Sequence, residues 1–418
     1  MKGGSPLPDG ALPGAGAPVA PPPGVVAEPP GARPRLFSVP FVLTCLAAFT
    51  FFLSHQMALV AVPLYVVSRG GGDTDAGTLT LLFAGASLIG RVPVGWAMER
   101  WGRRPIMMAG AGVAVASGLL YPAAQTVPAL FALRLFHGLA MGLFSTAAAV
   151  VATDVVPAAR RGEGLGVFGM GSNTALAVGP ILSLAVVGRF SFAPLFAASA
   201  AVALAALVLG AAVGETGTPA PVRFSFRPET AFHRGAVFPA TIVAALMVAH
   251  GGVVTFLPLM GQARPIGNPG AFFTAAAVLL LAVRAKAGSL SDRWGRGPVI
   301  VPGMLLTAAS MLLTGQAHAP RPLLAAGALY GLGLGLAQPA LMALAADRAG
   351  ESERGRAIAT LYTGWEMGIG LGAYACGYLL TWTDFTVTYR AAALVTAAGA
   401  AAYLVAPGRA GRRPLTGC

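Results

Sequence analysis

One acidic residue is notable because it lies deep inside an apolar run. Glu366 occurs in a Gly-Trp-Glu-Met-Gly sequence, away from both ends of that run. A charged side chain at the centre of a membrane helix costs about 2.5–3.5 kcal/mol, so such residues are retained mainly for function. A carboxyl group there can exchange a proton or bind a ligand, or it can stay neutral between helices. We expect Glu366 to act in proton coupling or substrate binding.

Other polar residues also lie within apolar runs. Arg134 can stabilise an anion or tune a neighbour such as His137 or Glu366, or it can extend to the outer membrane interface instead. His137, His55 and His250 can titrate near neutral pH or serve only as structural hydrogen-bonding groups. We expect Arg91, Arg284 and Lys286, near the ends of their runs, to extend to the interface. Further candidates for hydrogen bonds to a ligand are Gln56, Asn173 and Gln338.

The composition indicates what kind of elements hold these residues. Hydrophobic residues make up 56% of the 418 residues and charged residues only 10%, whereas soluble domains carry about 25% charged residues. No pair of the three cysteines has metal-ligand spacing, and no nucleotide-binding loop or cluster of carboxylates occurs. We therefore expect a membrane protein that is not an enzyme, with no catalytic residues, metal or cofactor.

Twelve apolar runs are long enough to cross a bilayer, which takes about 20 residues. They predict an all-α membrane protein with twelve transmembrane helices in two pseudo-symmetric six-helix bundles. The runs lie near 38–67, 76–98, 105–124, 128–153, 164–187, 190–214, 235–261, 270–291, 298–316, 322–346, 356–381 and 386–406. The predicted divisions are a disordered Pro/Gly-rich tail (1–36), the first bundle (37–214), a linker (215–234), the second bundle (235–407) and a tail (408–418).

The basic residues predict the orientation of these helices. The net charge is +13, and 19 of the 28 Lys and Arg residues fall on the side of the two termini, with five on the opposite side. Because cytoplasmic loops carry an excess of Lys and Arg, both termini are predicted to be cytoplasmic. The same asymmetry accounts for the net charge, so we expect no nucleic-acid partner. We expect a monomer in the bacterial inner membrane.

The second half of the chain repeats the first at a shift of 193 residues. Arg91-x-x-x-Gly95-x-x-x-Glu99-Arg100-Trp101-Gly102-Arg103 aligns with Arg284-x-x-x-Gly288-x-x-x-Asp292-Arg293-Trp294-Gly295-Arg296. The same shift pairs Asp154 with Asp347 and Asn173 with Glu366, while His55 matches His250 at a shift of 195. Parallel repeats of this kind place a substrate site between the halves, near mid-bilayer.

These motifs resemble a known transporter family. The Gly-x-x-x-(Asp/Glu)-Arg-x-Gly-Arg segment, present in both halves, is similar to the signature loop of the major facilitator superfamily. Arg134-x-x-x-Gly138-x-x-x-Gly142 is similar to that family's motif in its fourth helix. The resemblance covers residues 37–407. It departs at Glu99, where the family usually has Asp, and after Gly179-Pro180, where many drug antiporters of the family carry a glycine pair.

Spacing and resemblance together predict a conformational latch on the cytoplasmic side. Arg91, Gly95 and Glu99 share one helix face, and a glycine lets a neighbouring backbone come close. The resemblance implies that Glu99 meets the eleventh helix near Arg354, and Arg103 can bridge Glu99 to Asp154. The alternative is a set of basic residues that only fixes topology. The predicted latch comprises Gly95, Glu99, Arg100, Gly102, Arg103, Arg104, Asp154, Gly288, Asp292, Arg293, Gly295, Arg296, Asp347 and Arg354.

The function that these features predict is secondary active transport by alternating access. We expect proton-coupled export of a small organic compound, such as a drug, a sugar or a metallophore. Its expected partners are that substrate, protons and the lipid bilayer. Import, symport or facilitated diffusion of a small solute remains an alternative. From other classes, a non-transporting receptor or assembly protein on the same fold is an alternative, and so is an intramembrane enzyme.

Overall fold

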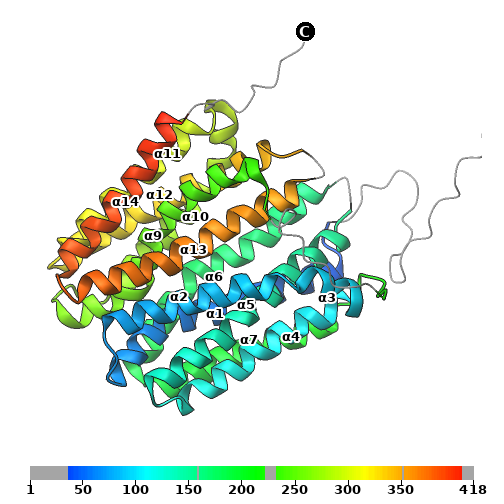
Figure 1. Ribbon diagram of the computed structural model, residues 1–418, viewed down its shortest axis with the longest axis horizontal. Coiled ribbons are helices and arrows are strands. Elements are labelled where there is room, and N and C mark those ends of the chain that lie inside the picture. Colours follow the sequence, from blue (N-terminus) through cyan, green and yellow to red (C-terminus); the bar gives the residue numbers. More distant parts are fainter. Residues whose placement is uncertain (1–35, 158–159, 222–231, 351–352, 407–418) are drawn as a thin grey trace, which may run out of the picture. The chain divides into compact units, whose positions relative to one another are not determined.

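The computed structural model describes residues 36–157, 160–221, 232–350 and 353–406. These residues form thirteen α-helices and one short 3-10 helix (Figure 1). The helices are α1 (Val39–Ser68), α2 (Asp73–Arg91), α3 (Val94–Trp101), α4 (Arg103–Leu120), η1 (Tyr121–Ala123), α5 (Val127–Val155), α6 (Arg161–Arg189), α7 (Phe192–Ala212), α9 (Arg234–Ala263), α10 (Gly270–Trp294), α11 (Gly297–Gly315), α12 (Pro320–Asp347), α13 (Arg354–Leu380) and α14 (Phe385–Val405).

The predicted apolar runs correspond to these helices, with α2 and α3 together forming one run. Among the described residues, eight helices are long and apolar enough to cross a membrane, or ten if the two bent pairs are each one span. The 27-residue α13 and the 21-residue α14 lie outside that set. The predicted tail 408–418 and nearly all of the tail 1–36 lie outside the described residues, as does the stretch 222–231 of the predicted linker.

The run at 76–98 is not one straight helix. It breaks at Val92 and Pro93, and α3 is bent by 46° from α2. Proline removes a backbone hydrogen bond and disfavours straight helix at that point. The matching segment of the second half is also bent, by 53°, between Arg284 and Lys286 of α10. Arg91 and Arg284 therefore stand at equivalent bends.

Polar residues fix several helix starts. Ser38 accepts a hydrogen bond from the Phe41 backbone N–H (3.4 Å) at the start of α1, and Asp384 accepts one from Val387 (2.8 Å) at the start of α14. These side chains satisfy backbone donors that the first turn of a helix leaves unpaired. The first described helix and the last are thus each capped by the residue directly before the helix.

Glycines bring matching helices together in the two halves. Gly138 of α5 lies against the Phe83 carbonyl of α2, and Gly331 of α12 lies against the Ala276 carbonyl of α10. A Cβ atom at either glycine would clash with the facing backbone. All four positions follow the shift of 193 residues, so the repeat found in the sequence is also a repeat of helix packing. It holds α2 and α10, which carry Arg91 and Arg284.

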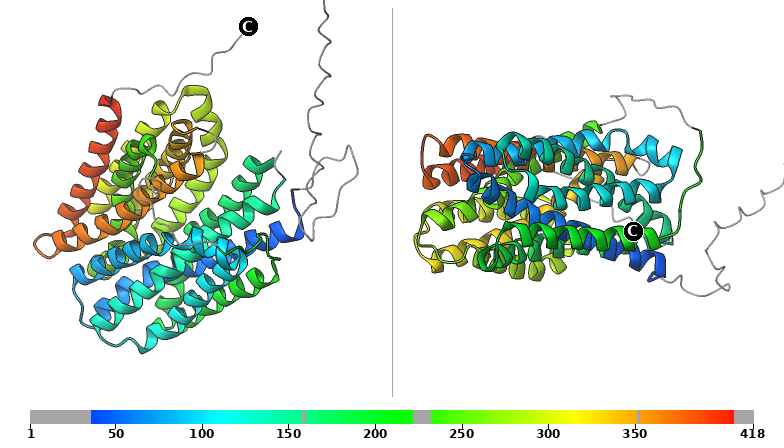
Figure 2. Two further views of the ribbon diagram at one scale, coloured as in Figure 1. Left: turned by 45° about the vertical axis from the view of Figure 1, so that its right-hand side comes forward. Right: turned by 90° about the horizontal axis from the view of Figure 1, so that it is seen from below.

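Helices of the first half of the chain contact helices of the second half, among them α2 with α13, α6 with α10 and α1 with α9. In Figures 1 and 2, α13 runs alongside α2, and α6 contacts α10. The α2–α13 contact includes Gly77 against the Ala373 backbone and Gly377 against the Asp73 backbone. These glycines lie near the helix ends that are joined by short loops, opposite to the chain termini. At that end the helices of the two halves pack backbone to backbone.

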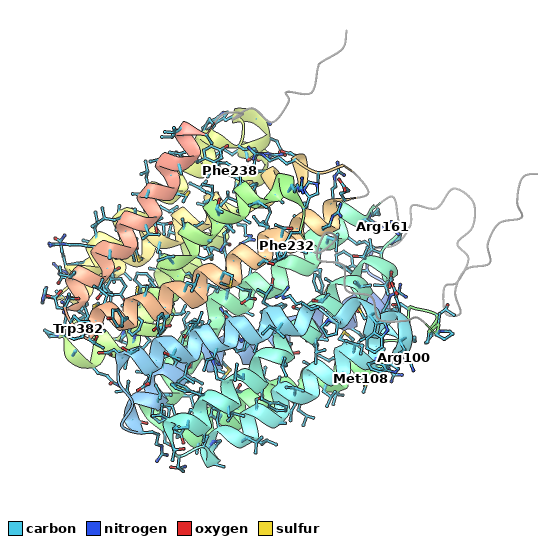
Figure 3. The ribbon with its side chains drawn as sticks, viewed as in Figure 1. Arg100, Met108, Arg161, Phe232, Phe238 and Trp382 are labelled. Atoms are coloured by element: carbon cyan, nitrogen blue, oxygen red, sulfur yellow. The ribbon has the colours of Figure 1, made fainter. Side chains whose placement is uncertain are left out.

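Basic side chains gather at the other end of the helices. Figure 3 shows Arg100 and Arg161 at one end, and Trp382 at the opposite end. Trp382 is 76% exposed in a loop that carries no Lys or Arg. The predicted orientation makes the Arg100 end cytoplasmic. We call it the terminal end, because α1 begins there and α14 ends there, and we call the end with Trp382 the loop end.

Candidate functional site

Glu366 forms an ion pair with a residue of the other half of the chain. Its Oε1 lies 3.2 Å from Nη2 of Arg91, and the two side chains are 9% and 23% exposed. The Arg91 guanidinium also lies 5.9 Å from the ring centre of Tyr362. The expectation that Arg91 extends to the interface is wrong. The chain bends directly after Arg91, and the side chain turns inward toward α13.

Glycines on two faces of α13 position Glu366. Gly364 and Gly368 pack against the backbone of α9, and Gly370 packs against Leu81 and Ala84 of α2. Because none of these glycines carries a side chain, α13 lies close to both neighbours. Glu366 is thus held near α2, where Arg91 can reach it.

The positions that match this ion pair in the repeat hold an arginine but no acidic residue. The shift of 193 residues relates Arg91 to Arg284 and Glu366 to Asn173. Arg284 donates from Nη1 to Oε1 of Gln338 on α12 (3.3 Å), and Gln338 is buried. The Asn173 amide donates to the Gly169 carbonyl of its own helix (2.7 Å). Arg284 therefore has a neutral partner where Arg91 has a carboxylate.

Arg134 lies fully inside the first half. It is 0% exposed, so it does not extend to the outer interface. Its Nη1 donates to the Tyr121 hydroxyl (3.4 Å), and its guanidinium lies 4.5 Å from the ring centre of Phe83. Its Nε and Nη2 atoms are buried without a hydrogen-bond partner among the described residues.

Two histidines share this cluster. The Tyr121 hydroxyl lies 3.1 Å from Nδ1 of His137, and the rings of His55 and Phe83 stack with centroids 4.7 Å apart. The His55 and His137 rings lie 6.1 Å apart. The structure thus brings together three of the predicted residues. Sequence reasoning missed Tyr121 and Phe83, because aromatic residues in apolar runs give no separate signal.

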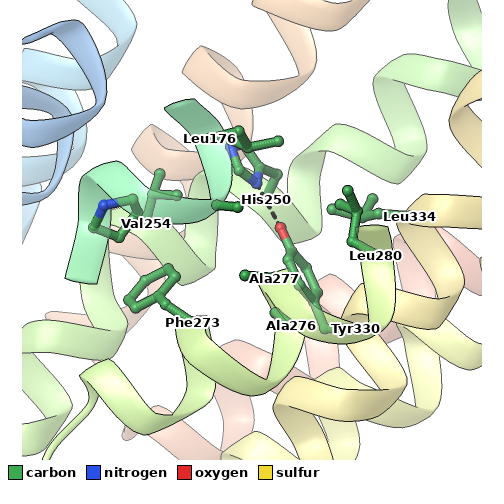
Figure 4. A pocket seen from close by; sticks show the side chains of 11 residues that line it. Leu176, His250, Val254, Phe273, Ala276, Ala277, Leu280, Tyr330 and Leu334 are labelled. Carbon is green, nitrogen blue, oxygen red and sulfur yellow. Dashed lines mark hydrogen bonds between the residues drawn. The ribbon is translucent and has the colours of Figure 1, made fainter. Parts of the chain in front are cut away.

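His250 occupies the matching place in the second half. Its Nδ1 forms a short hydrogen bond with the Tyr330 hydroxyl, drawn in Figure 4. Tyr330 aligns with His137 at the shift of 193 residues, so each half holds a related pair. Both residues line an apolar pocket with Leu176, Ala177 and Pro180 of α6, Val254 of α9, Phe273, Ala276, Ala277 and Leu280 of α10, and Leu334 of α12.

The candidates do not form a single cluster. The described residues show no direct contact of Glu366 with Arg134 or His137, so the expected tuning of Glu366 by Arg134 is not a contact in this conformation. Gln56 is buried against Gly179, with its amide nitrogen unpartnered among the described residues. The polar groups are therefore spread between the interface of the two halves and the interior of each half.

Ion pairs join some of the predicted latch residues within each half. Arg103 pairs with Asp154 (3.0 Å), and its repeat counterpart Arg296 pairs with Asp347 (2.8 Å). Arg296 also pairs with Asp292 (2.6 Å). Burial lowers the pKa of Arg296, but its hydrogen bonds to the two carboxylates outweigh this and raise the pKa above its ordinary value.

Glycines make the two latch loops possible. Gly102 and Gly295 precede these arginines with φ angles of 97° and 90°, a region that side chains with a Cβ rarely adopt. Each glycine ends one helix and allows the next to begin within two residues. The turn brings Arg103 and Arg296 back toward the ends of α5 and α12.

The predicted latch contacts of Glu99 are absent among the described residues. Among the described residues, no ion pair joins Glu99 to Arg103 or Arg354, and both Glu99 and Arg354 are exposed. A Cβ atom at Gly95 or Gly288 would meet no atom within 4 Å. Neither glycine therefore supports a close helix contact in this conformation. Arg100 and Arg293 are likewise exposed, and Arg104 donates to the Ala211 carbonyl (2.5 Å).

Glu215 contacts the predicted latch loop of the first half, and the sequence did not indicate this contact. Its carboxylate accepts hydrogen bonds from the backbone N–H groups of Arg103 (2.9 Å) and Arg104 (3.1 Å), at the start of α4. A carboxylate is stabilised by the positive end of a helix dipole. The neighbouring Thr216 hydroxyl donates to Asp154 (2.9 Å). The first residues after α7 thus bind the signature loop, a contact that the sequence spacing does not indicate.

The chain is similar to known transporters in sequence. It is 25% identical over 378 residues to an uncharacterized MFS-type transporter of Burkholderia pseudomallei (strain 1106a), covering 87% of this chain and 92% of the relative. It is 28% identical over 366 residues to a chloramphenicol efflux pump of Mycobacterium tuberculosis (strain ATCC 25618 / H37Rv), covering 83% and 86% of the two chains.

Solved structures share the fold. A POT family transporter in complex with 5-aminolevulinic acid matches with a TM-score of 0.72 at 13% identity, covering 88% of this chain and 95% of that one. A nucleoside transporter (NupG) matches with a TM-score of 0.69 at 13% identity, covering 88% and 99%. The family model described as Major Facilitator Superfamily matches residues 44–285 and 270–416. The chain is a multi-pass membrane transporter, not an enzyme, and belongs to the major facilitator superfamily.

Proposed function

We propose that this transporter exports a small organic compound in exchange for protons. It alternates between a conformation open at the terminal end and one open at the loop end. The relative that is a chloramphenicol efflux pump supports the direction of transport. The bacterial relatives support a place in the bacterial inner membrane. In the proposed orientation both termini are cytoplasmic. The two parts that move relative to each other are the predicted bundles, residues 37–214 and 235–407.

The Arg91–Glu366 ion pair carries the proposal. It joins α2 of one half to α13 of the other, and Glu366 is the acidic residue farthest from the helix ends among the described spans. A buried charge that loses its partner costs several kcal/mol. Protonation of Glu366 removes its charge and breaks the ion pair, so a proton can change how firmly the two halves hold together.

In this conformation the two halves pack closely at the loop end. We propose that the ion pair stabilises this conformation. Thr80 of α2 and Thr255 of α9 also hydrogen-bond across the halves (3.2 Å). Gly95 and Gly288, at the terminal end, face open space in the same conformation. In the proposed orientation the substrate enters from the cytoplasm in this state. Proton uptake by Glu366 from the outside then accompanies the opposite state, in which Gly95 approaches α13.

The membrane potential supplies enough energy for this exchange. One proton crossing 100 mV yields about 2.3 kcal/mol. A tenfold concentration ratio corresponds to about 1.4 kcal/mol. One proton per substrate therefore sustains a gradient of roughly fifty-fold, which a small-molecule exporter can use.

Transport in proteoliposomes tests the proposal. Protein is reconstituted with a pH-sensitive dye inside, and chloramphenicol is the probe compound. We expect chloramphenicol movement against its gradient when a proton gradient is imposed, with proton flux in the opposite direction. In Glu366→Gln, both the proton flux and the uphill movement should be lost. Glu163→Gln is the matched control, because Glu163 is an exposed acid paired with Arg160 outside this interface.

Two outcomes would contradict the proposal. Uphill transport by Glu366→Gln at the wild-type rate would remove Glu366 from the coupling mechanism. Proton and probe moving in the same direction would replace export by symport.

A further inference from the structure

We propose that the substrates of this transporter include compounds with an anionic group, and that Arg284 binds this group where the repeat of the fold has lost a carboxylate. This inference rests on the proposed transport function and adds the substrate class. The residues that carry it are Arg284, Asn173 and Gln338. They lie on α10, α6 and α12.

The first argument is the balance of charge within the spans. Within the spans the side chains of Arg91, Arg134 and Arg284 are buried or partly buried, and Glu366 is the buried acidic residue among the described residues. Glu366 pairs with Arg91. The remaining two cations, Arg134 and Arg284, have no carboxylate partner among the described residues, whereas buried charges in proteins are usually paired. An anionic substrate balances this excess.

The second argument is the register of the two contacts between the halves. In the α2–α13 contact, Gly370 packs against Ala84, and the Arg91–Glu366 pair follows toward the terminal end. At the shift of 193 residues, Gly370 aligns with Ala177, and Ala84 aligns with Ala277. Both of these alanines line the pocket, and Ala277 is labelled in Figure 4. The α6–α10 contact therefore repeats the register of the α2–α13 contact.

This register sets the level of Arg284 and Asn173. Asn173 lies about one helical turn from Leu176, and Arg284 about one turn from Leu280, in both cases toward the terminal end. Leu176 and Leu280 line the same pocket. Arg284 and Asn173 thus flank the terminal side of the pocket at the level where Arg91 and Glu366 meet in the other contact.

The third argument is the chemistry that remains at this position. Asn173 is neutral, and its amide nitrogen is used by the Gly169 carbonyl. Arg284 donates from Nη1 to the buried Gln338 side chain, which holds the guanidinium in place without neutralising it. A guanidinium offers a planar fork that matches a carboxylate, phosphate or sulfonate. A substrate carboxylate can therefore bind Arg284 as Glu366 binds Arg91.

Binding of a matched acid and amide tests this substrate class. Purified full-length protein is titrated with 1-naphthoate and with 1-naphthamide, which differ in charge and not in ring size, and tryptophan fluorescence reports binding. We expect the acid to bind about tenfold or more tightly than the amide, as for one charge-assisted contact. Arg284→Gln should abolish this preference, so that the variant binds the acid no more tightly than the amide.

The variant Asn173→Glu tests the geometry directly. It restores the carboxylate that the repeat lacks, so it should pair with Arg284 and reduce acid binding about tenfold. Asn173→Gln is the neutral control and should retain the preference for the acid. A thermal unfolding scan shows that each variant is folded. Equal binding of acid and amide by the wild type, binding of neither, or an unchanged acid preference in Asn173→Glu would overturn the inference.

This test is separable from the proposed function. Binding is measured without any gradient, whereas proton coupling is measured as flux that depends on Glu366. Loss of the acid preference with intact Glu366-dependent proton flux removes only the substrate class. An intact acid preference without Glu366-dependent proton flux removes only the proposed proton coupling.

Discussion

The guanidinium of Arg91 lies 3.2 Å from the carboxylate of Glu366, although 275 positions separate the two residues in the chain. The pair links the two repeats of the fold at a depth where charges are costly. Arg91 is the last residue of α2, directly before the bend to α3. Breaking the ion pair therefore frees the chain at the point where α2 and α3 change direction. The predictions below follow from this pair and from the latch loops.

The ion pair should stabilise the folded protein as a unit. Glu366→Gln or Arg91→Gln alone leaves a buried charge unpaired, so each should lower the free energy of unfolding by about 3–5 kcal/mol. The double variant leaves no unpaired charge and should recover most of that loss. Thermal unfolding of the four proteins in detergent measures this double-mutant cycle. Additive losses in the double variant would mean that the two residues act independently.

Gly95 should matter for transport and not for the stability of this conformation. A Cβ atom at Gly95 meets nothing within 4 Å, so Gly95→Leu should change stability by no more than about 0.5 kcal/mol. In the alternate state α3 approaches α13, and the leucine should block that approach and reduce transport by about tenfold or more. Thermal unfolding and proteoliposome transport measure the two effects.

Gly77 is the matched comparison at the loop end. A Cβ atom there would clash with the Ala373 backbone in this conformation. Gly77→Leu should therefore destabilise this state, by about 1–3 kcal/mol for overpacking. If Gly77→Leu and Gly95→Leu behaved alike in both assays, the assignment of a closed loop end and an open terminal end would be wrong.

The two latch ion pairs should contribute little to stability. The side chains of Arg103 and Asp154 are 30% and 28% exposed. Exposed ion pairs contribute about 0.2–1 kcal/mol to the free energy of unfolding. Arg103→Ala should therefore fold normally but slow the change between states, with the same result for Arg296→Ala in the second half. Transport rates and unfolding temperatures of both variants check this. A loss of stability above about 2 kcal/mol would indicate a structural role instead.

Labelling of two single-cysteine variants tests the orientation of the helices in the membrane. With the three native cysteines replaced by alanine, Trp382→Cys should react with a membrane-impermeant maleimide in whole cells. Arg100→Cys should react only after the membrane is opened, because the excess of basic residues marks its end as cytoplasmic. Labelling of Arg100→Cys in intact cells would reverse the orientation and, with it, the proposed direction of transport.

The sequence predicted the helices and the latch loops better than the central polar contacts. Apolar runs and a repeat at a fixed shift are local patterns, so the spans and the Arg103–Asp154 and Arg296–Asp347 pairs could be inferred. The break at Pro93 was not predicted, and the run 76–98 was expected to be one helix. Arg91 was expected at the interface because its depth depends on that bend.

Contacts between distant helices were harder to predict. The partner of Glu366 depends on which faces of α13 carry glycines toward α9 and toward α2, and the spacing of Gly364, Gly368 and Gly370 holds that signal. Tyr121 and Tyr330 could not be separated from ordinary core aromatics by type or spacing. Glu215 was assigned to a linker, and nothing in its neighbours indicates that it caps α4.

The most direct test of the account measures the distance between the halves at the loop end. Spin labels at Arg69→Cys and Trp382→Cys, one in each half, report this distance in protein lacking its native cysteines. Glu366→Gln mimics the protonated acid and removes the charge that binds Arg91. The account predicts that the population with a long distance increases in Glu366→Gln relative to the wild type. An identical distance distribution in the two proteins would contradict the claim that this ion pair controls which side is open.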